Sequence, residues 1–226
     1  MVKLSKRKKE FKKEFSPDQE YTIDEAVENI SKFPKAKFDE SIELHLALNI
    51  NPKNSDQMVR GTVILPNGLG KKVRVCVICK GEMEIQAKEA GADLVGNKDL
   101  IEQITKGFLG FDVVIAAPDM MRDLSRLGKI LGPRGLMPTP KAGTVTTDVA
   151  KAITEAKAGK VAFKSDKQAG IHAGIGKRSF DNDKILENIK ELVDAVNNAR
   201  PAVIKGNLIR SAYLSTTMGP GLRLKL

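Results

Sequence analysis

The sequence contains few of the residues on which catalysis, metal binding or aromatic stacking depends. Its 226 residues include two cysteines, two histidines and no tryptophan, and aromatic residues make up 4%. Neither His45 nor His172 lies in a recognisable nucleophile or metal motif, so acid–base and zinc chemistry lack their usual groups. A lone strand histidine is more often structural, although His172 is also a candidate for contact with RNA. We therefore expect neither an enzyme nor a bound cofactor or metal ion.

The two cysteines and the apolar segments exclude further classes. Cys76 and Cys79 lie in the run VRVCVICK, which is typical of a buried strand. Because side chains alternate along a strand, their odd separation puts the sulfurs on opposite faces and excludes a shared metal ion. No apolar run approaches the roughly 20 residues of a membrane-spanning helix, and the N-terminus lacks the apolar core of a signal peptide. We expect a cytosolic protein without a membrane partner.

Positive charge is in clear surplus. Lys and Arg number 38 against 28 Asp and Glu, which gives a formal net charge of +10. Such a surplus in a small protein indicates a polyanionic partner, here nucleic acid. Seven of the cations fall within the first fifteen residues. We interpret that segment as a basic helix or arm, and a solvated surface helix is the alternative.

Hydrophobic patterning divides the chain into two ends of one kind and a middle of another. Residues 38–50 alternate between apolar and polar, and similar alternation returns near the C-terminus, as in half-exposed antiparallel strands. In the middle, VRVCVICK and FDVVIAAP are continuous apolar strands followed by helical stretches at 82–90 and 119–131. The prediction is a discontinuous α+β sheet domain, residues 1–66 plus 159–226, with an inserted doubly wound (Rossmann-like) α/β domain at 67–158.

Two linkers join the predicted domains, and both contain turn-forming or small residues that can absorb changes in backbone angles. The candidate hinge residues are Pro66, Asn67, Gly68, Ala158 and Gly159. The discontinuous domain has 24 basic and 17 acidic residues, whereas the insert has 14 and 11. The two ends together are therefore expected to form the main RNA surface.

Two glycine-rich segments resemble phosphate-binding loops only superficially. GLGK at 68–71 precedes a predicted strand, whereas a dinucleotide fingerprint follows a strand and opens a helix. GIGK at 174–177 has neither the third glycine nor the Walker spacing. We expect no nucleotide site at either segment.

The stretch GKILGPRGLMPTPKAG at 128–143 is dense in Gly and Pro, and we predict that it has no regular structure. Its cations are Lys129, Arg134 and Lys141. A loop of this length in a compact domain usually has a function, and rigid Pro-containing segments can present cations to phosphate at low entropic cost. We therefore predict a second RNA contact here, with a plain connecting loop as the alternative.

The segment SAYLSTTMGP at 211–220 carries the clearest chemistry. Ser211, Tyr213, Ser215 and Thr217 share one strand face, where their hydroxyls can bond phosphate and ribose. Gly219 allows close backbone approach, and Met218 offers an adaptable apolar contact. The alternative is an ordinary strand that runs into a turn.

These segments together resemble the family of bacterial ribosomal protein L1. The similar strings are AKFDESIELH, GKILGPRGLMPTPKAG, IHAGIGK and STTMGP, and the resemblance covers essentially the whole chain. It implies the interrupted two-domain fold and a structural role in the large ribosomal subunit. By motif, the implied RNA contacts are Lys37, Phe38, Ser41, Glu43, Ser211, Thr217, Met218 and Gly219.

The resemblance also implies partners. These are the stalk of large-subunit rRNA, the exit-site tRNA whose release the hinged protein assists, and the leader of its own mRNA, whose translation it represses. We expect the free protein to be a monomer. The rival hypothesis is an α/β enzyme with an RNA-binding appendage, which requires a phosphate loop or catalytic constellation that the sequence does not show.

Among the implied contacts, Glu43, Phe38 and Ser41 differ from what charge, strand alternation or the family pattern would favour. Phosphate would repel Glu43, so its carboxylate should accept from a base amine or a ribose hydroxyl. Ideal alternation puts Phe38 on the core side with Ile42, so Phe38 is core unless a bulge near the strand start turns it outward. Ser41 stands where the family usually has Thr, which keeps the hydroxyl.

Overall fold

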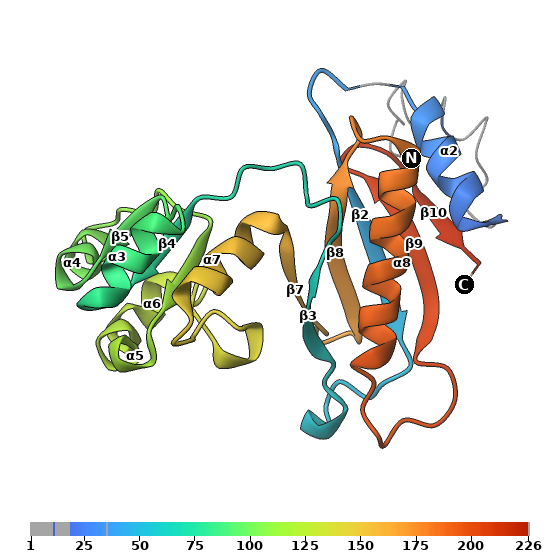
Figure 1. Ribbon diagram of the computed structural model, residues 1–226. Helices are drawn as coiled ribbons and strands as arrows, with labels where there is room; N and C mark the ends of the chain where they lie inside the picture. The colour runs from blue at the N-terminus through green and yellow to red at the C-terminus, as the bar shows by residue number, and fades with distance from the viewer. Residues whose placement is uncertain (1–10, 12–18, 35, 226) are drawn as a thin grey trace, which may run out of the picture. The chain divides into compact units, whose positions relative to one another are not determined.

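The computed structural model describes residues 11, 19–34 and 36–225, and the chain divides into two units (Figure 1). One unit is Met1–Gly70 with Val161–Leu226, and the other is Lys71–Lys160. The expected junctions, 66/67 and 158/159, lie a few residues before these positions. Apart from Phe11, the predicted basic arm lies outside the described residues. Phe11 is buried, and its ring packs edge-on against Phe33 with centroids 5.0 Å apart.

The discontinuous unit is a five-stranded sheet with two helices on one face (Figure 1). The strand order is β1-β10-β9-β2-β8, and the pairs are antiparallel except β1 with β10. The strands are β1 (Glu20–Tyr21), β10 (Gly221–Leu224), β9 (Ile209–Thr216), β2 (Ser41–Leu48) and β8 (Gly170–Lys177). The helices α2 (Ile23–Lys32) and α8 (Asn182–Asn198) bury their apolar faces against the sheet. Two segments from opposite ends of the sequence thus share one core, as the alternating patterns predicted.

Helix α2 begins as its sequence predicts. The Thr22 hydroxyl accepts from the Glu25 backbone N–H, and the Glu25 carboxylate accepts from the Thr22 backbone N–H. This reciprocal capping box satisfies two donors that would otherwise have no partner at the helix start. The helix then buries Ala26, Val27 and Ile30 on one side.

Strand β2 alternates as expected, with buried Ile42, Leu44, Leu46 and Leu48. It begins at Ser41, however, so Phe38 precedes the strand and is not subject to its alternation. Phe38 is 55% exposed, and the interpretation of Phe38 as core is wrong. A bulge does occur between Ile42 and Glu43 in the pairing with β8, but it lies after Phe38 and does not cause the exposure.

The chain leaves and re-enters this unit through a two-stranded sheet. β3 (Arg60–Ile64) pairs with β7 (Lys160–Lys164), and the short helix η1 (Ser55–Gln57) precedes β3. The outward linker therefore follows one strand of this pair, and the return linker ends at the other.

The inserted unit is a parallel sheet of three strands in the order β5-β4-β6. Along the chain its main elements are β4 (Val75–Ile78), α3 (Glu82–Glu89), β5 (Leu94–Gly96), α4 (Lys98–Thr105), β6 (Val113–Ala116) and α7 (Val149–Ala158). The chain passes from β4 through α3 to β5 on one side of β4. It then returns through α4, past β4, to β6 on the other side. With right-handed crossovers, these helices cover opposite faces of the sheet. The doubly wound class predicted from the sequence is confirmed.

One segment of the insert differs from expectation. The predicted helix at 119–131 consists of four short pieces, η2 (Pro118–Met120), α5 (Met121–Leu124), η3 (Ser125–Leu127) and α6 (Gly128–Leu131). The prediction that 128–143 has no regular structure is therefore wrong for α6 and for η4 (Pro140–Ala142). Burial of Leu127 and Leu131 on one side holds α6 in place despite Gly128.

Both cysteines are completely buried and free. Cys76 lies in β4 and Cys79 directly follows it. Desolvation raises the pKa of the Cys76 thiol to about 12. The structural role that the spacing predicted is consistent with this burial.

Candidate RNA interface

The sheet face opposite the two helices is polar. Along β9, Ser211, Tyr213 and Ser215 are at least partly exposed, while Ala212 and Leu214 between them are buried. The strand register places polar side chains of the neighbouring strands beside them. His45 of β2 pairs with both His172 of β8 and Tyr213 of β9. The hydroxyl row predicted from the sequence is therefore continuous with polar side chains of two neighbouring strands.

The two histidines form the centre of this face. Their Nδ1 atoms are 2.9 Å apart, so one ring must donate and the other accept, and this contact holds a single proton. His45 Nε2 lies 3.0 Å from Ser215 Oγ and 3.8 Å from Glu43 Oε2, and His172 Nε2 lies 3.5 Å from Asp166 Oδ2. Desolvation, with a smaller effect of His172, lowers the pKa of His45, and Glu43 partly opposes this.

Asp166 is held beside His172 by its own turn. Its Oδ1 accepts from the backbone N–H groups of Gly170 and Gln168 at 2.7 and 2.8 Å. These bonds lower the pKa of the Asp166 carboxyl, with a smaller contribution from His172. The sequence predicted His172 as a candidate contact but did not predict that His45 and Asp166 lie beside it, because these contacts depend on strand register and on the turn before β8.

A second group of residues lies where β2 begins and β9 ends. The Ser41 backbone N–H donates to Thr217 Oγ1 at 3.0 Å, and the Thr217 backbone N–H donates to the Ser41 carbonyl at 3.1 Å. Lys177, at the end of β8, donates from Nζ to Ser41 Oγ at 2.8 Å. We call Lys37, Phe38, Ser41, Lys177, Thr217, Met218 and Gly219 the edge site. Lys177 was not among the predicted RNA contacts, because nothing in the segment GIGK indicates that its lysine reaches Ser41.

The edge site has exposed apolar side chains, and its turn at Gly219 is tightly packed against the core. Phe38 and Met218 are 55% and 54% exposed. A methyl group at Gly219 would lie only 2.4 Å from Thr216 Oγ1 and 3.0 Å from the Phe33 ring, so only glycine fits without movement. The close backbone approach predicted for Gly219 is therefore made by the protein's own core. Partner atoms would meet Phe38 and Met218 from the solvent side.

The remaining predicted residues lie apart from the edge site. Ser211 pairs with Ala47 near the other end of the sheet, and Glu43 lies one step along β2 from the edge, opposite Ser215. Lys129, Arg134 and Lys141 belong to the inserted unit and are exposed, and no ion pair joins them to other described residues.

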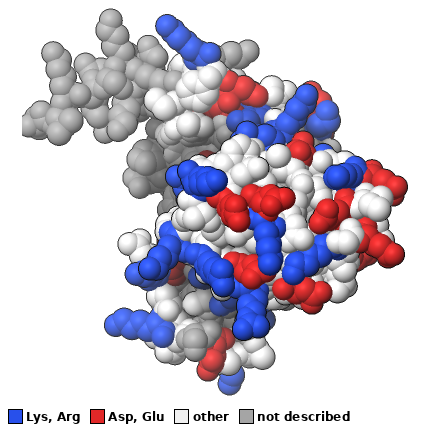
Figure 2. All heavy atoms as spheres, turned by 90° about the vertical axis from the view of Figure 1, so that its left-hand side faces the viewer, with Lys and Arg blue, Asp and Glu red and all other residues white. Residues whose placement is uncertain are grey.

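The surface shown in Figure 2 carries Lys and Arg interspersed with Asp and Glu. Several of the insert's cations are neutralised locally, since Lys71 and Arg74 bond to Asp112 at 2.7 and 3.3 Å. These bonds, that of Lys71 first, lower the pKa of Asp112 to about 2. Because the face in Figure 2 carries charges of both signs, it does not form one uniformly positive patch.

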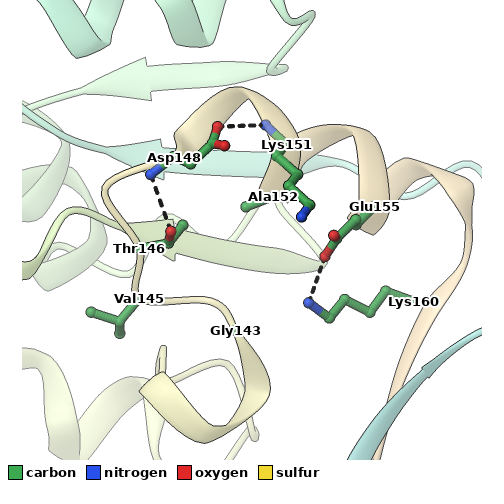
Figure 3. Close-up of a pocket in the computed structure, with 8 residues that line it drawn as sticks. All are labelled: Gly143, Val145, Thr146, Asp148, Lys151, Ala152, Glu155 and Lys160. Atoms are coloured by element: carbon green, nitrogen blue, oxygen red, sulfur yellow. Dashed lines mark hydrogen bonds and ion pairs between the residues drawn. The ribbon is translucent and has the colours of Figure 1, made fainter.

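A hollow of about 230 Å3 in the inserted unit offers little chemistry (Figure 3). Three of its four charged side chains have partners: Lys160 Nζ lies 2.8 Å from Glu155 Oε2, and Asp148 accepts from the Lys151 backbone N–H as the cap of α7. Elsewhere, GIGK forms part of the extended strand β8, and GLGK opens no helix. Neither segment has the geometry of a phosphate loop.

The described residues contain neither a candidate metal centre nor a candidate membrane-spanning helix. They contain no group of three or more His, Cys, Asp or Glu side chains that could hold a metal ion. None of the helices formed by these residues is both long and apolar enough to span a membrane.

An interrupted sheet unit with a polar open face and an inserted doubly wound unit define a protein of two units, the first discontinuous in sequence. Residues 30–220 match the model of the ribosomal protein L1p/L10e family, and the chain belongs to this family. It is 54% identical to large ribosomal subunit protein uL1 of Kosmotoga olearia over 99% of the chain and 97% of that protein. The proteins of the same name from Solibacter usitatus and Thermosipho africanus are 55% and 52% identical, over 91% and 99% of the chain and 87% and 97% of those proteins.

Family membership confirms the resemblance drawn from the four sequence strings. It also confirms the predicted class, a ribosomal protein of the large subunit rather than an enzyme.

Proposed function

We propose that the chain binds the stalk of large-subunit rRNA and that the edge site makes the main contact. The observation that carries this proposal is the joint between Ser41 and Thr217, which brings residues from opposite ends of the sequence to one edge of the sheet. Phe38, Met218 and Lys177 surround this joint. A stacking group, an adaptable apolar group, hydroxyls and a cation are together suited to a folded RNA surface.

The chemistry of each group indicates its role. Lys37 and Lys177 neutralise phosphates, and Phe38 stacks on a base or ribose. Glu43 accepts from a base amine or a ribose hydroxyl, which gives structural specificity. The polar face continues through His172 to Ser211, so a long RNA helix or loop can extend along β9 from the edge site.

We further propose that the inserted unit moves as a hinged second contact through Lys129, Arg134 and Lys141. Of the predicted hinge residues, Asn67 is tethered, since its backbone N–H donates to Asn188 Oδ1 at 3.2 Å and its side chain donates to Glu187 at 2.7 Å. The Gly68 carbonyl also accepts from Asn188. Pro66, Asn67 and Gly68 then form the fixed base of the outward linker, and motion occurs beyond Gly68.

The return linker has a single suitable point. Gly159 ends α7 with φ 102°, in the left-handed region that favours glycine, and directly follows Ala158. Rotation at Gly159 changes the direction of the chain without breaking α7 or β7. Such motion is the basis of the proposed role in admitting and releasing exit-site tRNA.

The same surface supports the proposed repression of translation. An mRNA leader that presents the fold of the rRNA stalk would bind the edge site in the same way. The two RNAs would then compete for the free, monomeric protein. As part of the ribosome, the protein works in the cytoplasm.

Footprinting on large-subunit rRNA tests the rRNA proposal. The full chain should protect one segment of the stalk at nanomolar to micromolar concentration, and protection spread evenly over the RNA would contradict the proposal. A chain that joins residues 1–66 to 159–226 should retain most of the affinity.

A further inference from the structure

A buried ion pair lies directly behind the edge site. Glu40 is completely buried, the Arg178 side chain is 10% exposed, and Arg178 Nη1 lies 3.4 Å from Glu40 Oε1. A buried carboxylate is costly unless hydrogen bonds satisfy its oxygens. Glu40 meets this condition, because Oε1 also accepts from the Ala36 backbone N–H and Oε2 accepts from the Met218 backbone N–H, both at 3.2 Å.

Arg178 ties down the segment that leads to Phe38. Its guanidinium donates to the backbone carbonyls of Ser31, Phe33 and Pro34. Its backbone N–H donates to the Glu40 carbonyl at 2.8 Å. The planar guanidinium with five donors suits this task, which a lysine ammonium cannot reproduce.

The next residue adds a second tie. Ser179 donates from its backbone N–H and its hydroxyl to the Asp39 carboxylate at 3.1 and 2.9 Å. Three segments far apart in the sequence, 31–40, 177–180 and 216–219, therefore meet at one charged pair. Two of them carry the exposed apolar groups of the edge site, Phe38 and Met218.

We infer that Glu40 and Arg178 are positioning residues of the RNA site, an inference that rests on the proposed function. The pair does not touch RNA. Each Glu40 oxygen holds a different segment, so the carboxylate fixes the Phe38 segment and the Met218 turn relative to each other. An apolar pair of equal volume could fill the space but could not bind both backbone N–H groups.

Glu40→Gln tests this inference because it keeps the size of the side chain. The glutamine amide has only one oxygen, which can accept either from Ala36 and Arg178 or from the Met218 N–H. Its NH2 group then faces the donor that has lost its acceptor, and two donors cannot bond to each other. We expect affinity for a fluorescently labelled transcript of the rRNA stalk to fall about tenfold, as for loss of one hydrogen bond to a charged group. The thermal unfolding transition, followed by tyrosine fluorescence, shows whether the variant is folded.

A double-mutant cycle separates positioning from general destabilisation. Once Glu40→Gln has displaced the Met218 turn, removal of the Met218 side chain should cost less than it does in the parent, so Glu40→Gln and Met218→Ala should be less than additive. Ser211→Ala, near the other end of β9, is the matched control and should be additive with Glu40→Gln. The Met218 methyl NMR signal of the free protein should also shift in Glu40→Gln and stay in place in Ser211→Ala.

Arg178→Lys provides a second, independent cycle. It keeps the charge beside Glu40 but releases carbonyls of the 31–34 segment, so it should be coupled to Phe38→Ala. If Glu40→Gln does not fold, this cycle decides the question. Additivity in the cycles of the folded variants would overturn the inference. Failure of the unchanged protein to bind the stalk transcript would overturn the proposed function instead.

Discussion

Replacing Gly219 by alanine tests how tightly the turn after β9 is packed. The added methyl group would lie 2.4 Å from Thr216 Oγ1, closer than real side-chain carbons approach such an atom, and at a tight 3.0 Å from the Phe33 ring. The φ angle of Gly219 is outside the left-handed region, so the cost is steric rather than conformational. Overpacking of this kind costs about 1–3 kcal/mol. We expect the free energy of unfolding to fall by this amount, and RNA affinity to fall with it.

Thr216 decides how much of this cost can be relieved. Its Oγ1 is buried and has no hydrogen-bond partner among the described residues. Thr216→Ala therefore removes the obstructing atom without breaking a hydrogen bond in this part of the protein. The double variant with Gly219→Ala should recover more than half of the lost stability. The remainder comes from the contact with Phe33, whose ring must move slightly.

Urea unfolding followed by tyrosine fluorescence is the suitable assay. Both tyrosines, Tyr21 and Tyr213, belong to the discontinuous unit, and the chain has no tryptophan, so the signal reports on this unit alone. Gly174→Ala is the control, because its methyl group would meet only Leu69 Cδ2, at 3.9 Å. Unchanged stability of Gly219→Ala, or failure of Thr216→Ala to relieve it, would refute the packing argument.

Three further predictions concern binding and pH. Thr217→Ala and Met218→Asp should weaken specific RNA binding much more than Lys37→Ala, which should mainly reduce the slope of affinity against salt; equal effects in a salt titration would contradict this. Because desolvation lowers the pKa of His45 below 6.5, the unfolded chain binds more protons in acid, so stability should fall as the pH drops through this region, and less so in His45→Phe. The stabilisation from Asp112, whose pKa is about 2, should be complete above pH 3.8 and disappear as the pH falls towards 2. Asp112→Asn should cost about 1 kcal/mol, measured by hydrogen exchange of β4 amides.

The sequence predicted the elements that are long and strictly periodic. Strand β2 and helix α8 each bury one complete face, so their burial patterns repeat at the strand and helix periods. By contrast, β5 has three residues and no fully buried one, and the pieces between Pro118 and Leu131 are short turns held by tertiary packing. Such elements depend on neighbours that local patterns do not describe.

The candidate site divides in the same way. Thr217, Met218 and Gly219 could be found because their residue types are unusual at the end of a strand. Lys177 and Arg178 could not, because their roles arise from bonds to residues more than 130 positions away in the sequence. The exposure of Phe38 could not be derived from strand alternation, because β2 begins only at Ser41.

The make-up of the edge site indicates how it would hold RNA. Its described cations are Lys37 and Lys177, and Lys177 already bonds to Ser41, while Glu43 lies exposed nearby. Because the salt dependence of binding grows with the number of phosphates neutralised, two cations give a shallow slope. Most of the affinity must then come from the fit of RNA against hydroxyls, Phe38 and Met218. A site of this kind is more sensitive to displacement of a turn than to loss of one charge, which is why the buried pair behind it matters.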